Sequence, residues 1–160
     1  MLNRKKSPII LILCFFSLPL WAGSFYEQGV EAYRLSHLEE AETALKSALI
    51  EEPDQDKIHL LLGAVYQKMN QADKAENIMR QGLVLEGENK DNLTFNLANL
   101  YYSQNRKDEA IDLYKDITET QSPFQNGALL NRANCYLSLS DYPEALEDYI
   151  EYLKQEPSTP

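Results

Sequence analysis

The stretch ADKAENIM at residues 72–79 decides the fold, because near copies of it return along the chain. The copies are LEEAETAL at 38–45, KDEAIDLY at 107–114 and YPEALEDY at 142–149. Their shared alanines lie 34, 35 and 35 residues apart, at Ala41, Ala75, Ala110 and Ala145. A second small residue lies 12 residues before each of them, at Gly29, Gly63, Ala98 and Ala133. A fixed period of this length is typical of stacked supersecondary units.

Each unit is predicted to contain two amphipathic helices. In the second unit the apolar residues recur at spacings near 3.6 and do not alternate as in a strand. Asn70-Gln71 breaks this unit in the middle, and turn signals such as Glu52-Pro53-Asp54 separate the units. We therefore expect an all-α fold of eight helices, near residues 25–35, 38–51, 56–69, 72–85, 91–104, 107–119, 126–139 and 142–155.

The small residues have a mechanical role in this fold. Two helices of a hairpin approach closely only where a side chain is missing or reduced to a methyl group. We expect Gly29 and Ala41 to meet at such a crossing. Tyr33 and Leu45 are expected to fill the gaps on either side of it.

The first 24 residues have the pattern of a secretory signal peptide. A basic start, MLNRKKSP, precedes the 13-residue apolar run IILILCFFSLPLW, and the small residues 22–24 follow. The run is shorter than the roughly 20 residues of a membrane-spanning helix. We expect cleavage after Ala22 or Ser24 and export, with the periplasm as the destination. Secretion, or anchoring to the membrane by an uncleaved leader, are the alternatives.

Cleavage would leave one cysteine, Cys135, because Cys14 lies inside the leader. Cys14 follows Leu13 in the middle of the apolar run, so a lipid anchor is not expected. Cys135 is predicted to be a buried small apolar residue rather than a reactive thiol. The mature chain therefore has no internal disulfide.

The charge of the chain is strongly acidic. The formal net charge is −10, and it becomes −13 for residues 25–160, because three basic residues and no acid lie in the leader. This excess argues against nucleic acid and anionic membranes as partners, since both bind through Lys and Arg. Most acids lie beside lysines on helix surfaces and are interpreted as a solvated outer face, with an acidic docking patch as the alternative.

Nothing in the sequence indicates catalysis or a cofactor. His37 and His59 are not spaced with Cys, Asp or Glu as metal ligands are, and no metal is expected. The glycines are scattered and form neither a phosphate-binding loop nor a nucleophile elbow. A non-enzymatic protein without cofactors is predicted.

At the repeated positions the chain resembles the tetratricopeptide repeat family. The shared features are the small residue of the first helix, the aromatic residue one turn later, the alanine of the second helix and a closing proline. In the first unit they are Gly29, Tyr33, Ala41 and Pro53. Three departures are the missing opening Trp, Gly87 in place of a proline, and Arg132 in a slot that is usually apolar. The last suggests a local polar contact.

The resemblance implies a right-handed α-solenoid of four helix-turn-helix repeats, at about 25–55, 56–89, 90–124 and 125–157, with a tail at 158–160. It also implies a concave groove, made by the first helix of each unit, that holds a peptide or helix of a protein partner. The groove residues expected to bind the partner are Tyr33, Lys57, Lys68, Phe95, Asn96, Asn99, Tyr102, Asn131 and Asn134.

Four of these asparagines repeat in step. Asn96 and Asn131 are 35 residues apart, and so are Asn99 and Asn134. An asparagine amide carries a donor and an acceptor and so matches one peptide unit of an extended chain. The alternative is that these amides bind neighbouring helices of the chain itself. A clamp for chaperone tails would need more Lys and Arg beside them and is not expected.

The last helix supplies a second candidate surface. Solenoids usually end in a polar capping helix, and none is recognised after the fourth unit. A homo-oligomer could form through the exposed face, whose residues are predicted to be Leu146, Tyr149, Tyr152 and Leu153. The leading prediction is a scaffold or adaptor of the cell envelope that binds a protein partner. A self-assembling structural subunit, and an auxiliary subunit of an envelope enzyme complex, are the alternatives.

Overall fold

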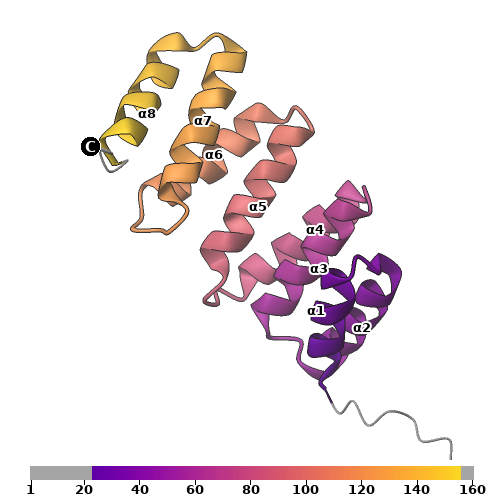
Figure 1. The fold of residues 1–160 in the computed structure, drawn as a ribbon. Helices are drawn as coiled ribbons and strands as arrows, with labels where there is room; N and C mark the ends of the chain where they lie inside the picture. Colours follow the sequence, from indigo (N-terminus) through magenta and orange to yellow (C-terminus); the bar gives the residue numbers. More distant parts are fainter. Residues whose placement is uncertain (1–22, 156–160) are drawn as a thin grey trace, which may run out of the picture.

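The computed structural model describes residues 23–155, and this part of the chain contains eight α-helices and no strand. The helices lie side by side in pairs and form one elongated stack, with α1 at one end and α8 at the other (Figure 1). The predicted all-α fold is confirmed, and the observed helix ends agree with the predicted ends to within one residue. The leader prediction for residues 1–22 and the tail at 158–160 lie outside the described residues. The helices are α1 (Phe25–Arg34), α2 (Leu38–Glu51), α3 (Asp56–Lys68), α4 (Ala72–Val84), α5 (Lys90–Ser103), α6 (Lys107–Thr118), α7 (Gln125–Leu139) and α8 (Tyr142–Gln155).

Each hairpin turns at one residue with left-handed backbone geometry. These residues repeat with the units: Ser36, Asn70, Asn105 and Ser140 have φ angles of 61°, 57°, 63° and 69°. The amide of the next residue then donates to a carbonyl five positions back, as in His37 N to Ala32 O at 2.9 Å. This bond satisfies a carbonyl at the end of the first helix and fixes the position at which the second helix begins. Asn tolerates this backbone geometry better than most residues, which explains the break predicted at residues 70–71.

The small residues let the two helices of a hairpin approach each other, as predicted. A Cβ atom on Gly29 would lie 2.6 Å from Cγ of Leu45, and one on Gly63 would lie 2.7 Å from Cε of Met79. The nearest side chain to Gly29 is that of Leu45, which was expected to lie beside the crossing of Gly29 and Ala41. Ala41 is itself fully buried in the core.

Successive units contact each other through their first helices more than through their second helices. The second helix of each unit packs on the first helix of the next, and the first helices α1, α3, α5 and α7 also touch one another in sequence. Within residues 23–155 the second helices make no such contacts among themselves. The stack therefore curves towards its first helices, whose exposed sides form the inner face.

A buried carboxylate explains why Gly87 can replace a proline between the second and third units. Asp56, at the start of α3, accepts hydrogen bonds from N and Nδ2 of Asn89 at 2.7 and 2.9 Å. A side chain on Gly87 would collide with this carboxylate. The turn is thus held by hydrogen bonds, whereas the first unit has the conformationally restricted Pro53 at the equivalent position.

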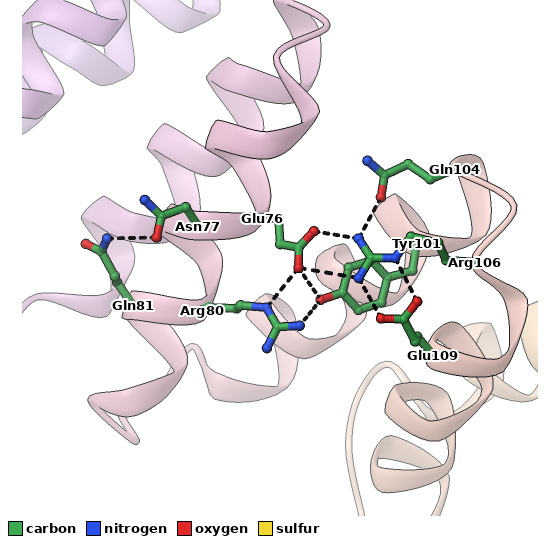
Figure 2. Close-up of polar contacts among 8 residues, drawn as sticks. All are labelled: Glu76, Asn77, Arg80, Gln81, Tyr101, Gln104, Arg106 and Glu109. Carbon is green, nitrogen blue, oxygen red and sulfur yellow. Dashed lines mark hydrogen bonds and ion pairs between the residues drawn. The ribbon is translucent and has the colours of Figure 1, made fainter.

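A polar cluster joins the second unit to the third, across α4, α5 and α6 (Figure 2). Glu76 of α4 accepts hydrogen bonds from Arg106 Nη1 at 2.6 Å, from the Tyr101 hydroxyl at 2.9 Å and from Arg80 Nε at 3.0 Å. The Arg106 guanidinium lies 3.9 Å above the Tyr101 ring and also pairs with Glu109. The hydrogen bonds, with that from Arg106 foremost, outweigh burial and hold the pKa of Glu76 at about 2.

The first junction contains a simpler version of this cluster. Tyr66 donates to Glu42 at 3.2 Å, and Glu42 pairs with Lys46. At the third junction Ile111 occupies the register position of the glutamate and Tyr136 that of the tyrosine. The polar clamp therefore recurs at two of the three junctions and is most extensive in the middle of the stack.

We predict that Glu76→Gln lowers the free energy of unfolding at pH 7 by about 1–3 kcal/mol, because charge-assisted hydrogen bonds are lost. The pKa of Glu76 is lower in the folded than in the unfolded state, so its stabilisation is complete above the unfolded value of 4.5 and is lost as the pH falls towards 2. Urea unfolding of both proteins from pH 7 to pH 3 should show the difference shrinking. A difference independent of pH would contradict the role assigned to the carboxylate.

Candidate partner-binding face

The inner face carries the residues predicted to bind a partner. In its first half two lysines lie over tyrosines of the preceding unit. Lys57 Nζ is 4.9 Å from the ring centre of Tyr26, and Lys68 Nζ is 4.2 Å from that of Tyr33. These cation–π contacts cross from α1 to α3 and fix the lysine stems. They place positive charge on the inner face.

In the second half of the inner face, asparagines bind tyrosines of the second helices. The Tyr114 hydroxyl donates to Asn99 Oδ1 at 2.6 Å, and the Tyr149 hydroxyl donates to Asn134 Oδ1 at 2.7 Å. Asn131 Nδ2 also donates to Asn99 Oδ1, at 2.9 Å, and so links α7 to α5. The alternative reading of the asparagines, as partners of neighbouring helices, is thus seen for these three amides.

These bonds leave a defined set of polar atoms. Three amide atoms have no hydrogen-bond partner within the described residues. They are Nδ2 of Asn99, Nδ2 of Asn134 and Oδ1 of Asn131. Asn96 uses Nδ2 to bind O and Oδ1 of Asn92, which leaves its own Oδ1 as an acceptor. The inner face therefore presents both donors and acceptors whose orientation is fixed by the fold.

The tyrosines that hold the asparagines were not recognised in the sequence, although a signal existed. Tyr114 and Tyr149 occupy the register positions of Leu45 and Met79 in the first two units. A tyrosine hydroxyl in that core position needs an acceptor. The asparagines appear one residue after Ala98 and Ala133, only in the two units that have these tyrosines.

Two other predicted residues of the inner face differ in exposure. Phe95 is partly buried, stacked on Phe124 with ring centres 5.3 Å apart and edge-on to Tyr114 at 6.0 Å. It mainly joins the third unit to the fourth. Tyr102 is 41% exposed and remains available to a partner.

Charge is divided between the two kinds of helix. The first helices carry four acidic and five basic side chains, whereas the second helices carry 14 acidic and six basic ones. The net negative charge of the protein is therefore concentrated on the second helices, away from the inner face. This distribution agrees with the interpretation of the acids as a solvated outer surface.

In residues 23–155 no group of three His, Cys, Asp or Glu side chains could hold a metal ion. His59 is buried with Nδ1 3.1 Å from Gln55 O, and His37 lies exposed at the start of α2. Burial raises the pKa of the Cys135 thiol to about 11, so the thiol is protonated at neutral pH. Cys135 is fully buried, as predicted.

The comparisons with known proteins agree with this architecture. Residues 32–91 and 95–160 each match the tetratricopeptide repeat family. The chain is a tetratricopeptide repeat protein. Repeats of this family are generally non-enzymatic modules that bind other proteins. A search of curated proteins gives no match.

Solved structures resemble this tetratricopeptide repeat protein in fold. MamA is 19% identical, with a TM-score of 0.72 over 81% of this chain and 74% of its own. YrrB, described as a repeat protein with an unusual peptide-binding site, is 22% identical, with a TM-score of 0.71 over 84% and 68%. PilF of Pseudomonas aeruginosa is 20% identical, with a TM-score of 0.73 over 82% and 60%. The predicted family and α-solenoid fold are confirmed.

The face predicted for oligomers is only partly exposed in this repeat protein. Leu146 and Leu153 are 60% and 67% exposed. Tyr149 is half-buried and bonded to Asn134, so it belongs to the fourth hairpin. Tyr152 is half-buried as well.

No helix in residues 23–155 is long and apolar enough to cross a membrane.

The polar contact suggested by Arg132 is a buried ion pair. Arg132 Nε and Nη2 each donate to Asp148 at 2.7 Å, and Nη1 donates to Thr118 at 2.9 Å. The two charged side chains are 15% and 6% exposed. They occupy the register positions of Leu97 and Leu113 and border a cavity of about 810 Å³ between α6, α7 and α8. All the hydrogen-bonding groups named here are paired, so the ion pair is a packing element.

We predict that Arg132→Leu or Asp148→Leu alone destabilises the fold by about 3–5 kcal/mol, because each leaves an unpaired buried charge. The double variant Arg132→Leu/Asp148→Leu restores the apolar pair of the third unit and should be close to wild type or more stable. Urea unfolding of the three variants measures this. Additive losses in the double variant would refute the interpretation.

Proposed function

We propose that this protein is a non-enzymatic adaptor whose inner face binds an extended segment of a protein partner. The observation that carries the proposal is the set of oriented amides: Asn99 and Asn134 each present a donor, and Asn131 between them presents an acceptor. A peptide backbone offers a carbonyl and an amide at every residue and can bind such a set whatever its side chains are. That YrrB has a peptide-binding site in a similar fold supports this role.

The charge of the inner face limits which kinds of partner segment can bind there. Lys57 and Lys68 lie on it, while the acids are concentrated on the second helices. The first helices carry only four acidic side chains, of which Glu31 is paired with Arg34 and Asp56 is bonded to Asn89, so a strongly basic segment would meet few matching carboxylates there. We therefore infer that the bound segment is uncharged or acidic and that its aromatic or apolar side chains lie near Tyr33 and Tyr102.

The partner can be captured by a photo-crosslinking amino acid placed at Tyr102, with the same group at Val84 of α4 as control. Val84 is 81% exposed but lies on a second helix. The inner position should crosslink a discrete protein that the outer position does not. Equal crosslinking from both positions would overturn the proposal.

Binding energetics can then be tested without disturbing the fold. Asn99→Asp/Asn134→Asp keeps the oxygen that accepts from each tyrosine and removes the free donor. We predict an affinity for the captured partner at least about tenfold lower, as two hydrogen bonds are lost. Asn77→Asp, on the exposed side of α4, is the matched control for added charge and should bind as wild type. Unchanged affinity in the double variant would contradict the assignment of these amides.

We further propose that the protein works in the cell envelope, and that its partner is an envelope protein. The basic and apolar start of the sequence supports export to the periplasm. If the leader is cleaved, the purified protein should begin at Gly23 or Phe25 by mass spectrometry and appear in the periplasmic fraction. A full-length chain in the cytoplasmic fraction would contradict this location.

A further inference from the structure

The outer side of α8 carries a continuous stripe of exposed apolar side chains. Tyr142, Leu146, Ile150 and Leu153 are 62%, 60%, 46% and 67% exposed. Their spacing of four, four and three residues places them on one side of the helix along almost its whole length. Such a stripe is typical of a helix that pairs with another helix.

Stacking of a further repeat does not account for the whole stripe. The register position of Ile150 is occupied by Lys46, Arg80 and Lys115 in the first three units. These side chains are 55%, 57% and 60% exposed although a following unit packs beside each of them. Inside the solenoid a cation at this position keeps more than half of its side chain exposed, and in the second unit Arg80 also donates to the Tyr101 hydroxyl of the next unit at 2.6 Å, a bond that an isoleucine cannot make. The replacement of a cation by Ile150 therefore indicates a different contact.

The opposite end of the stack is not built to receive this stripe. Helix α3 packs on α2 of the preceding unit, and Leu62 and Val65 of α3 are buried. The equivalent residues of α1 are Gln28 and Glu31, and Glu31 pairs with Arg34 at 2.6 Å. A second copy would thus bring polar side chains to the apolar stripe if it stacked head to tail. This arrangement is disfavoured.

We propose that two copies of this chain form a symmetric dimer in which their α8 helices pack antiparallel to each other. In the heptad of a paired helix, Leu146 and Leu153 occupy d positions and Ile150 an a position. Antiparallel packing then places Ile150 of each copy against the second copy's Leu153. The contact is closed by a twofold axis and cannot grow into a fibre.

Charge selects the antiparallel direction. Glu147 and Lys154 occupy e positions beside the stripe, and e positions face each other in an antiparallel pair. Glu147 of each copy therefore lies opposite the second copy's Lys154, and the pair occurs twice. In a parallel pair Lys154 would face Tyr149, and no opposite charges would meet. Lys154 pairs with the half-exposed Glu151 of its own helix at 3.1 Å.

The dimer leaves the inner faces open. The predicted binding residues lie on α1, α3, α5 and α7, whereas the pairing residues lie on α8. Each dimer therefore carries two inner faces. Two faces would strengthen binding to a partner that has two copies of the bound segment. The inference stands independently of the proposed partner binding.

The test is the mass of the protein in solution by sedimentation equilibrium, with the chain produced with its own leader so that any processing takes place. Wild type should be a dimer at high concentration. Ile150→Lys, which restores the charge of the other units, should be monomeric with unchanged circular dichroism. Val84→Lys changes a more exposed apolar residue on α4, which is 81% exposed against 46% for Ile150, and should stay dimeric. A monomeric wild type, or mass that keeps growing with concentration, would overturn the proposal.

A charge exchange tests the direction of the helices. Glu147→Lys and Lys154→Glu should each weaken the dimer by about threefold to tenfold, because like charges then face each other. The double variant Glu147→Lys/Lys154→Glu should recover wild-type affinity. Absence of recovery would overturn the antiparallel arrangement.

Discussion

The close approach of the two helices in each hairpin is the constraint on which the rest of the structure depends. Leu45 and Met79 lie directly on the glycines of the first two units, and Ala41 and Ala75 are fully buried beside these crossings. In the third and fourth units the small residue is alanine, and a tyrosine takes the facing position. That exchange brings a hydroxyl into the core, and the asparagines that accept its hydrogen bond lie on the inner face. The residue that packs against the small residue of each hairpin thus determines which polar atoms remain for binding a partner.

The sequence predicts the fold well because the information is local and repeated four times. Spacing of small residues, helical periodicity and turn residues each act within one unit, and their agreement gave helix ends within one residue of those observed. The partners of polar side chains were less predictable, because they depend on distance in space. Arg132 was recognised as unusual, but Asp148, 16 residues away on another helix, could not be identified as its partner. The roles of Tyr114 and Tyr149 were missed because tyrosine in a helix is as compatible with apolar packing as with hydrogen bonding.

The asparagines show why repetition alone does not establish a binding site. Their interval of 35 residues is what a ladder of peptide-binding amides would produce, and it is also what a repeated tyrosine contact produces. In Asn99, Asn131 and Asn134 one atom of the amide is hydrogen-bonded within the fold, and the other has no partner among the described residues. The two interpretations are therefore compatible, since the internal bond orients the atom that is left for a partner.

The uneven polar clamps between units have a consequence for how the stack comes apart. In a linear array each unit is held only by its neighbours, so the order of opening follows the strength of the junctions. The Glu76 cluster reinforces the middle junction, while the third junction has Ile111 in place of a clamping carboxylate and is held instead by the Asn131–Asn99 and Arg132–Thr118 hydrogen bonds. Local opening should therefore begin at the ends and spare α4 and α5, which would give the backbone amides of those helices the slowest hydrogen exchange. The central pair of units then acts as the rigid support from which the outer units bend.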